Sequence, residues 1–367
     1  MHAVEQLAIL GIGTAVPAFR LDQRDASSRI MTIMQGEPEL ARWANRIFSH
    51  CGVDTRYTCE SNLLEPAERC RYVAVTDGER VPTTAERMAL YRQASVPLAT
   101  DAAAKALADS DVRPGEITHL LVASCTGMFL PGIDAGLAWK LDLPADVRMR
   151  PLTFLGCAAG LTALREAMAV VRGDPNAKVL VVNVELCSIH IQPSLSKEEL
   201  FTAALFGDGA SACVVGMTDG HRNGAFGLRD ARAVRFPESE ALMEWEIGDY
   251  GFRLRLSPRI PGLIGEYAPS AVSRFWGDES LPERWAIHPG GRGIVDAVQR
   301  AFRLSDAQTE ASREILRDYG NMSSATILFV LDAMRRQRSE AGGVPADGIA
   351  VAFGPGVTAE LLRFVLL

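Results

Sequence analysis

Short runs of β-branched and other apolar residues alternate along this chain with segments of helical period, and this alternation constrains the fold most. Runs of this kind are typical of buried strands. They cover residues 7–13, 117–125, 150–155, 178–185, 211–216, 284–288 and 348–353. Capping boxes predict two of the intervening helices, one from Thr83 to about Asp109 and one from Ser305 to near Gly320. Strands that alternate with helices predict an α/β fold.

The length of the chain allows two domains or two fused halves, because 367 residues exceed the usual size of one domain. Residues 218–224 are polar and rich in turn formers, and the alternation resumes after them. We therefore predict an N-terminal half over residues 1–220 and a C-terminal half over residues 221–367. Residues 54–80 are charged and lack a periodic pattern, which favours a surface excursion.

The composition excludes several classes of function. Lysine and arginine number 38 against 45 acidic residues, so the net charge of −7 argues against nucleic-acid binding. No apolar run approaches the ~18 residues of a membrane span, and no signal-peptide pattern is visible, so we expect a cytoplasmic protein. The seven cysteines are scattered without a C-x-x-C pair, which favours reduced thiols and no metal site.

Cys157 is the cysteine best placed for chemistry. It lies between Gly156 and residues 158–160, Ala-Ala-Gly, after an apolar strand and at the start of an amphipathic helix. Unpaired N–H groups and the helix dipole favour a thiolate at such a position, and a thiolate attacks carbonyl carbons. The small neighbours leave space for a substrate. The alternative is that Cys157 is a small buried hydrophobic residue.

His288 is the strongest partner for this cysteine among the six histidines. It ends a predicted strand and precedes Pro289 and the glycine pair Gly290 and Gly291. Its ring is therefore predicted at the carboxyl edge of a sheet, where open α/β sheets bind ligands. The glycine pair allows close approach of a bulky ligand. We expect a thiolate–imidazolium pair, and a structural histidine at a strand end is the alternative.

Asn321 supplies a third polar group, between a helix that ends at Gly320 and the next helix. Its amide can cap the following helix, and it can also donate hydrogen bonds to an enolate oxygen at any pH. Cysteine, histidine and asparagine in this chain order also occur in papain-like proteases. The C-G-S-C-W surround of the papain-type nucleophile is absent here, so order alone decides nothing.

Five motifs then occur in a fixed order along nearly the whole chain: residues 155–160, 204–210, 285–291, 320–324 and 353–358. Together they resemble the type III polyketide synthases, the chalcone synthase superfamily. The resemblance implies the thiolase fold with a duplicated five-layered αβαβα core, and usually a homodimer. It also implies repeated decarboxylative condensation of malonyl-CoA onto an acyl starter from acyl-CoA, followed by cyclisation, with CoA thioesters as substrates and no cofactor.

The resemblance implies roles for the catalytic candidates. Cys157 carries the acyl group, and His288 and Asn321 stabilise the enolate of the malonyl thioester. Phe206 corresponds to a gate residue between the CoA tunnel and the cavity. The second aromatic gate of the plant enzymes aligns near Leu254, a departure that leaves Phe252 as the alternative gate. Further substrate contacts are implied at Cys125, Thr126, Leu130, Cys187, His190, Trp245 and Ser323, and CoA contacts at Arg46, Gly290 and Gly291.

Within the superfamily, residues 185–192 and 243–252 look most like the bacterial alkylpyrone and alkylresorcinol synthases, which use fatty acyl starters. This predicts a pyrone or resorcinol-type product. Three alternatives stay open. His190 and Trp245 could close the tunnel and leave a malonyl-primed enzyme, the chain could be a ketoacyl-ACP synthase of the priming type, or it could be a silent thiolase-fold binding protein. The ketoacyl-ACP synthases carry a motif like H-Q-A-N where this chain has residues 288–291.

Overall fold

A computed structural model describes residues 6–34, 36–72, 81–194, 196–219, 224–277, 280–341 and 345–367. Its main feature is a nine-stranded sheet in the order β11-β12-β13-β8-β1-β7-β6-β4-β5. The strands of the first half are β1 (Gln6–Ala15), β4 (His119–Ser124), β5 (Arg148–Thr153), β6 (Val179–Leu186) and β7 (Asp208–Thr218). Those of the second half are β8 (Phe226–Arg235), β11 (Arg284–Ile287), β12 (Ala346–Gly354) and β13 (Thr358–Leu366).

The strands of the two halves are joined over a short contact. Strands β1 and β8 pair only through Ala8 with Gly227 and Ile9 with Phe226, whereas β1 pairs with β7 along its whole length. The sheet can therefore bend at this joint, and its two parts enclose a layer of helices between them. Two short hairpins lie outside it: β2 (Phe19–Asp22) with β3 (Thr55–Thr58), and β9 (Met243–Gly248) with β10 (Gly251–Leu256).

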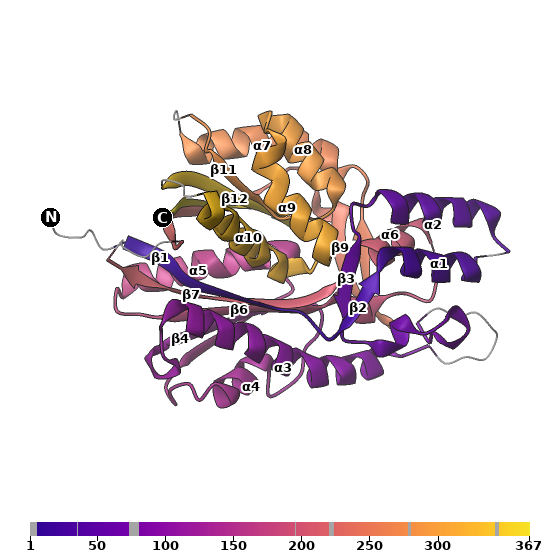
Figure 1. Ribbon diagram of the computed structural model, residues 1–367, viewed down its shortest axis with the longest axis horizontal. Helices are drawn as coiled ribbons and strands as arrows, with labels where there is room; N and C mark the ends of the chain where they lie inside the picture. Colours follow the sequence, from indigo (N-terminus) through magenta and orange to yellow (C-terminus); the bar gives the residue numbers. More distant parts are fainter. Residues whose placement is uncertain are drawn as a thin grey trace.

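Helices complete five layers, which Figure 1 shows nearly edge on. Outer helices α3 (Thr84–Ser110) and α4 (Ile133–Lys140) cover the first part of the sheet. Helices α5 (Ala159–Gly173) and α10 (Thr326–Ala341) lie between the two parts, and α7 (Ile260–Trp276) and α8 (Arg292–Phe302) cover the second part. This layering confirms the predicted α/β thiolase fold. Helix α9 (Asp306–Tyr319) packs beside α10.

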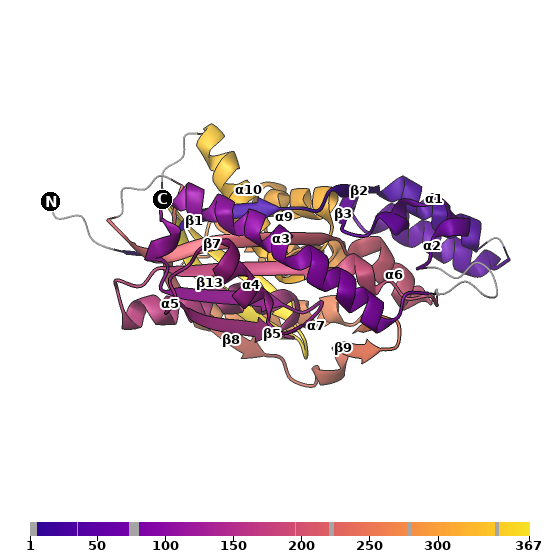
Figure 2. The same cartoon turned by 90° about the horizontal axis from the view of Figure 1, so that it is seen from below.

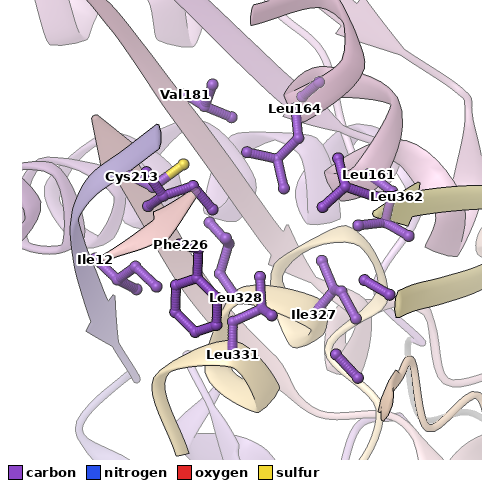
Figure 3. Close-up of a cluster of buried hydrophobic side chains, with 14 of the residues drawn as sticks. Ile12, Leu161, Leu164, Val181, Cys213, Phe226, Ile327, Leu328, Leu331 and Leu362 are labelled. Carbon is purple, nitrogen blue, oxygen red and sulfur yellow. The ribbon is translucent and has the colours of Figure 1, made fainter. Parts of the chain in front are cut away.

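The middle layer contains the largest buried apolar cluster, and Figure 3 shows its centre. Side chains of α5 and α10 meet residues from both parts of the sheet there: Ile12, Leu161, Leu164, Val181, Cys213, Phe226, Ile327, Leu328, Leu331 and Leu362. Apolar burial is the main favourable term in folding, at roughly 25 cal/mol per Å². The cluster therefore holds the two halves together and fixes the starts of α5 and α10 against each other.

A smaller assembly of helices extends from one end of the sandwich (Figure 2). It consists of α1 (Gln23–Ile33), α2 (Pro38–His50) and α6 (Lys197–Leu205) with the β2–β3 hairpin. The predicted excursion over residues 54–80 begins with β3 and continues as two short 3-10 helices, Ser61–Leu64 and Ala67–Arg69. Residues 73–80 of that prediction lie outside the described residues, and so does the predicted boundary between the halves at residue 220.

Both predicted capping boxes are present. The Thr83 N–H donates to Glu86 Oε2 at 2.9 Å, and the Ser305 N–H donates to Gln308 Oε1 at 3.0 Å. The predicted burial of the strand over residues 150–155 is wrong, because β5 is the outermost strand of its half and five of its six residues are exposed. An edge strand has a neighbour on one side only, and sequence pattern does not reveal which strand lies at the edge.

Candidate active site

A cavity of about 700 Å³ lies where the sandwich meets the smaller helical assembly. Helices α2 and α6, the β9–β10 hairpin, the start of α7 and the loops after β4, β5 and β11 form its walls. Cys157, His288 and Asn321 all line it. Most of the other lining side chains are apolar, so the cavity combines a few convergent polar groups with a dry wall, as ligand sites commonly do.

The strands that deliver Cys157 and His288 are the two outermost strands of the nine-stranded order. Cys157 follows β5 at one end, and His288 directly follows β11 at the other. They line the same cavity because the sheet folds back around the helices α5 and α10. The predicted placement of His288 at a strand end is confirmed, whereas the meeting of these particular strands depends on the tertiary fold.

The turn that carries Cys157 has an unusual backbone. Phe154 and Gly156 have φ values of 56° and 63°, in the left-handed region that favours glycine. A Cβ atom on Gly156 would come within 2.5 Å of the Pro355 ring. A short 3-10 helix, Gly156–Ala158, then leads into α5. The predicted glycine-flanked turn at a helix N-terminus is confirmed.

Asn321 is held in a defined orientation beside this turn. Its backbone N–H donates to the Leu205 carbonyl at 2.9 Å, and its Oδ1 accepts the Ser323 N–H at 2.8 Å. The N-cap position expected for Asn321 is occupied by Met322 instead, and the Asn321 oxygen binds the first N–H of the short 3-10 helix Ser323–Ala325 from one residue further back. Since Oδ1 is occupied, Nδ2 is the atom free to serve a ligand; it lies 3.3 Å from the Gly290 carbonyl and 3.8 Å from Cys157 Sγ.

His288 is almost fully buried at 1% exposure, yet neither ring nitrogen has a hydrogen-bond partner among the described residues. Its backbone is fixed, because its N–H donates to the Val351 carbonyl at 2.8 Å and its carbonyl accepts from Gly290 at 2.9 Å. Buried polar groups normally have partners. A ring that lines a cavity with both nitrogens unsatisfied is therefore prepared for a ligand.

Burial opposes charge on both Cys157 and His288. It raises the pKa of the Cys157 thiol to about 11, although hydrogen bonds from Ser323 and Asn321 act in the opposite direction. It lowers the pKa of His288 to about 3. Desolvation therefore acts against the thiolate–imidazolium pair that the sequence suggests, and that pair stays a prediction. In both side chains burial favours the neutral form over the charged one.

Most of the predicted substrate contacts line the same cavity: Phe206, Leu254, Cys125, Thr126, Cys187, Trp245, Ser323, Gly290 and Gly291. Phe206 stands at the end of α6, and Leu254 lies opposite Trp245 in the β9–β10 hairpin. The indole Nε1–H of Trp245 donates to the Cys125 carbonyl at 3.0 Å, which fixes the indole as a wall of the cavity.

His190 and Phe252 do not line the main cavity, so their predicted contacts with substrate stay a prediction. The His190 Nε2 pairs with the Thr126 carbonyl at 2.7 Å, and its Nδ1 accepts the Phe252 N–H at 2.9 Å. The two rings stack with centroids 4.4 Å apart. Both instead face a separate cavity of about 20 Å³. With both nitrogens bonded, His190 braces the hairpin that carries Trp245.

Leu130 and Arg46 are also absent from the cavity wall. The Leu130 side chain is 89% exposed and does not line the cavity of the single chain, so its predicted contact with substrate stays a prediction. Arg46 is exposed on α2 with its guanidinium carbon 5.9 Å from the Trp43 ring. Only Trp43 of this pair lines the cavity, and the contact of Arg46 with CoA stays a prediction.

The sequence did not predict two lining residues of the cavity, Trp43 and Lys197. Trp43 of α2 lines the cavity while its side chain is 42% exposed, and Lys197 at the start of α6 lies with Nζ 4.4 Å from the centre of the Trp43 ring. A cation over an aromatic face is attractive by about 0.5–1 kcal/mol at exposed sites. The residues are 154 positions apart. No local pattern signals such a pairing, although a partly exposed tryptophan on an amphipathic helix is a general sign of a binding surface.

The part of the chain that the structure describes was compared with the requirements of a membrane-spanning helix and of a metal site. No helix in that part of the chain is long and apolar enough to cross a membrane. No group of three or more histidine, cysteine, aspartate or glutamate side chains there is placed to hold a metal ion.

An α/β sandwich of this kind, with a cysteine, a histidine and an asparagine in one apolar cavity, defines the class of condensing acyltransferases. Residues 2–219 match the N-terminal domain of the chalcone and stilbene synthases, and residues 228–366 match their C-terminal domain. The chain therefore belongs to this family, the type III polyketide synthases. It is an acyltransferase that acts by decarboxylative condensation, and its family is not that of the ketoacyl-ACP synthases considered as an alternative.

Individual relatives are similar to this chain over nearly its whole length. The alpha-pyrone synthesis polyketide synthase-like Pks18 of Mycobacterium tuberculosis is 31% identical over 98% of this chain and 91% of its own length. The bisdemethoxycurcumin synthase of Oryza sativa subsp. japonica is 32% identical over 97% of this chain and 91% of its own. The type III domain of Steely1 from Dictyostelium superposes with a TM-score of 0.89 at 26% identity, covering 98% and 99% of the two chains.

Proposed function

We propose that this polyketide synthase loads an apolar acyl starter from acyl-CoA onto Cys157, extends it with malonyl-CoA and cyclises the product to a pyrone. One observation carries the proposal: Cys157, His288 and Asn321 line a single cavity whose other walls are mostly apolar. The similarity to Pks18, whose name refers to alpha-pyrone synthesis, supports the same product class. The reaction needs CoA thioesters and no metal or nicotinamide.

The first step is acyl transfer to Cys157. The neutral thiol is a weak nucleophile, so its proton passes to His288 as Sγ attacks the thioester carbonyl of the starter. The new Sγ–C bond forms and the bond from carbon to the CoA sulfur breaks. The CoA sulfur takes the proton from His288, so CoA leaves as a thiol. Burial, which opposes charge on both side chains, also excludes the water that would hydrolyse the acyl-enzyme.

The second step is decarboxylation of malonyl-CoA. Loss of CO2 breaks a carbon–carbon bond and leaves an enolate, whose oxygen accepts hydrogen bonds from Asn321 Nδ2 and from the imidazole ring N–H of His288. Preorganised donors of this kind contribute roughly 3–4 kcal/mol each in related oxyanion sites. The enolate carbon then attacks the thioester on Cys157, forms the new carbon–carbon bond and releases the cysteine.

The length of the starter follows from the cavity wall. Each buried methylene contributes about 0.8 kcal/mol, so an apolar wall favours a medium or long acyl chain even after part of the gain is lost to chain ordering. A short, malonyl-primed starter is the second candidate, and Trp245 favours it because its indole is fixed within the wall by the hydrogen bond to Cys125.

A panel of acyl-CoA starters distinguishes the two candidates. The purified enzyme is incubated with malonyl-CoA and acyl-CoAs from acetyl to palmitoyl, and the products are identified by mass spectrometry. We expect kcat/KM to rise with chain length, with tri- and tetraketide pyrones as products. A flat or falling dependence would favour the short starter, and the absence of any ketide or acyl adduct would indicate a silent binding protein.

We also propose that the enzyme is a cytoplasmic homodimer. Large apolar side chains are exposed around the edge strand β5 and helix α4, namely Met128 (53%), Leu130 (89%), Trp139 (73%) and Met149 (42%). A second copy of the chain that covers them would remove an unpaired strand edge from solvent. Light scattering should give twice the mass of one chain, and Trp139→Asp should lower it, whereas Leu281→Asp, at 46% exposure elsewhere, should not.

A further inference from the structure

Glu185 is a buried carboxylate without a charged partner in any hydrogen bond that the described residues make to it. It lies near the end of β6 and has 0% exposure. Burying a carboxylate is costly unless its environment compensates for the lost water. Burial accordingly raises the pKa of Glu185, and the hydrogen bonds that it accepts act against that rise. Since it does not line the cavity, it is not placed to touch a substrate.

The two carboxylate oxygens are bonded to different halves of the molecule. Oε1 accepts the Ser324 hydroxyl of the second half at 2.5 Å. Oε2 accepts the Thr126 hydroxyl at 2.8 Å and the Cys125 N–H at 3.0 Å, both from the loop after β4 in the first half. Glu185 thus bridges two segments that no backbone hydrogen bond of the central sheet joins.

Each of these segments leads directly to a candidate catalytic residue. The Cys125 sulfur accepts the N–H of Gly156 at 2.9 Å, and Gly156 precedes the nucleophile. On the other side, Ser324 follows Ser323, whose N–H holds the Asn321 side chain. The start of α5, just after Cys157, also packs closely against the Ser324 segment, since a Cβ on Gly160 would come within 2.4 Å of the Ser324 carbonyl oxygen.

We propose that Glu185 is a positioning residue that sets the distance between the catalytic cysteine and the catalytic asparagine by bridging Cys125 and Ser324. The inference rests on the proposed function for the identity of the catalytic pair. Condensation joins a group held on Cys157 to an enolate held by Asn321, so it requires their mutual placement. Acylation uses Cys157 and His288 but not the asparagine, and decarboxylation uses Asn321 and His288 without an acyl group on the cysteine.

Two substitutions separate the length of the bridge from its charge. Glu185→Asp keeps the charge but is one methylene too short to reach both segments. Glu185→Gln keeps the length, and its amide can accept from the loop after β4 while it donates to the Ser324 hydroxyl, which can also accept. Glu360→Asp is the matched control, because Glu360 is a 5% exposed carboxylate that binds Arg165 and Thr162 away from the turn.

The experiment measures three rates in each variant: acylation of the protein by mass, CO2 release from malonyl-CoA, and ketide formation. We expect Glu185→Asp to lose at least about tenfold in ketide formation while the other two rates stay within about threefold, as misplacement of two reacting groups requires. Glu185→Gln should stay within about threefold in all three rates, and Glu360→Asp should show no selective loss of ketide formation.

Three outcomes overturn the inference: full ketide formation in Glu185→Asp, an equal fall of its three rates, or a loss in Glu185→Gln as large as in Glu185→Asp. Hydrogen–deuterium exchange provides a readout independent of activity. Peptides covering residues 154–160 and 321–326 should both exchange faster in Glu185→Asp than in Glu360→Asp, and unchanged exchange would contradict the bridge. A wild type that makes no ketide would instead contradict the proposed function. The exchange data would still test whether Glu185 holds the two segments together.

Discussion

The amide nitrogen of Asn321 lies 3.8 Å from the sulfur of Cys157, although 164 residues separate them along the chain. Each residue stands where a short 3-10 helix begins or is about to begin, before α5 and before α10. These two helices form the middle layer of the sandwich, and their shared apolar cluster fixes their starts. The contact across the site is thus a consequence of the central core.

Replacing Asn321 tests the role of its amide. Asn321→Ala should lower malonyl-CoA decarboxylation by about 100-fold or more, because an enolate oxygen loses a donor that acts only in that step. Acylation of Cys157, followed as a mass increase of the protein in a single turnover, should change by less than about threefold. An equal fall of both rates would make Asn321 a structural cap, as its bond to Ser323 also allows.

The alkylation of Cys157 should depend steeply on pH. Burial raises its pKa to about 11, so the thiol is mostly protonated in the resting enzyme at neutral pH. Since the thiolate is the reactive form, the iodoacetamide rate should rise about tenfold per pH unit between pH 7 and 9. The Cys157→Ala variant supplies the background of the other six thiols. A plateau below pH 8 would reveal a preformed thiolate–imidazolium pair instead.

The stability of the protein should respond to the neutral state of His288. Its folded pKa of about 3 lies below the unfolded value near 6.5, so only the unfolded chain binds the proton between these values. Stability contributed by neutral His288 is therefore present above pH 6.5 and is lost as pH falls towards 3. The free energy of unfolding, measured in urea at pH 7 and 5, should fall by more in the wild type than in His288→Asn. The slopes of the unfolding free energy against pH should differ between the two proteins by a value that approaches 1.4 kcal/mol per pH unit. Identical slopes would contradict the neutral state of His288.

Removing the indole of Trp245 should lengthen the accepted starter. Trp245 lines both the main cavity and the small cavity beside it, so Trp245→Gly joins the two spaces. We expect the ratio of kcat/KM for palmitoyl-CoA over acetyl-CoA to rise at least about tenfold, on the scale of a few buried methylenes. Trp245→Phe keeps most of the ring volume and serves as the control. An unchanged ratio in Trp245→Gly would show that the acyl chain lies elsewhere.

The sequence predicted the local features of the site and missed those set by tertiary packing. The turn at Cys157 and the strand end at His288 follow from glycines and periodicity, which are local signals. The orientation of His190 depends on the Thr126 carbonyl and the Phe252 N–H, which reach it from other segments. The exposure of Leu130 likewise follows from its loop in the folded chain, and no periodic pattern encodes it.

Local sequence signals also do not determine the protonation state of Cys157. A helix N-terminus indicates a stabilised thiolate, but the degree of burial decides between that effect and desolvation. Burial depends on the hairpin β9–β10 and on α6, both of which close over the cavity from more distant parts of the chain. The bridge through Glu185 is similar, since Ser324 and Thr126 meet it from opposite halves.

The central claim, a covalent acyl intermediate on Cys157, is tested most directly by the intact mass of the protein. The enzyme is incubated with palmitoyl-CoA alone, digested and mapped, and malonyl-CoA is then added. We predict one palmitoyl group, located on Cys157, absent in Cys157→Ala and discharged as a ketide product when malonyl-CoA arrives. Ketide formation by Cys157→Ala, or an adduct on Cys125 or Cys187 in its place, would contradict the account.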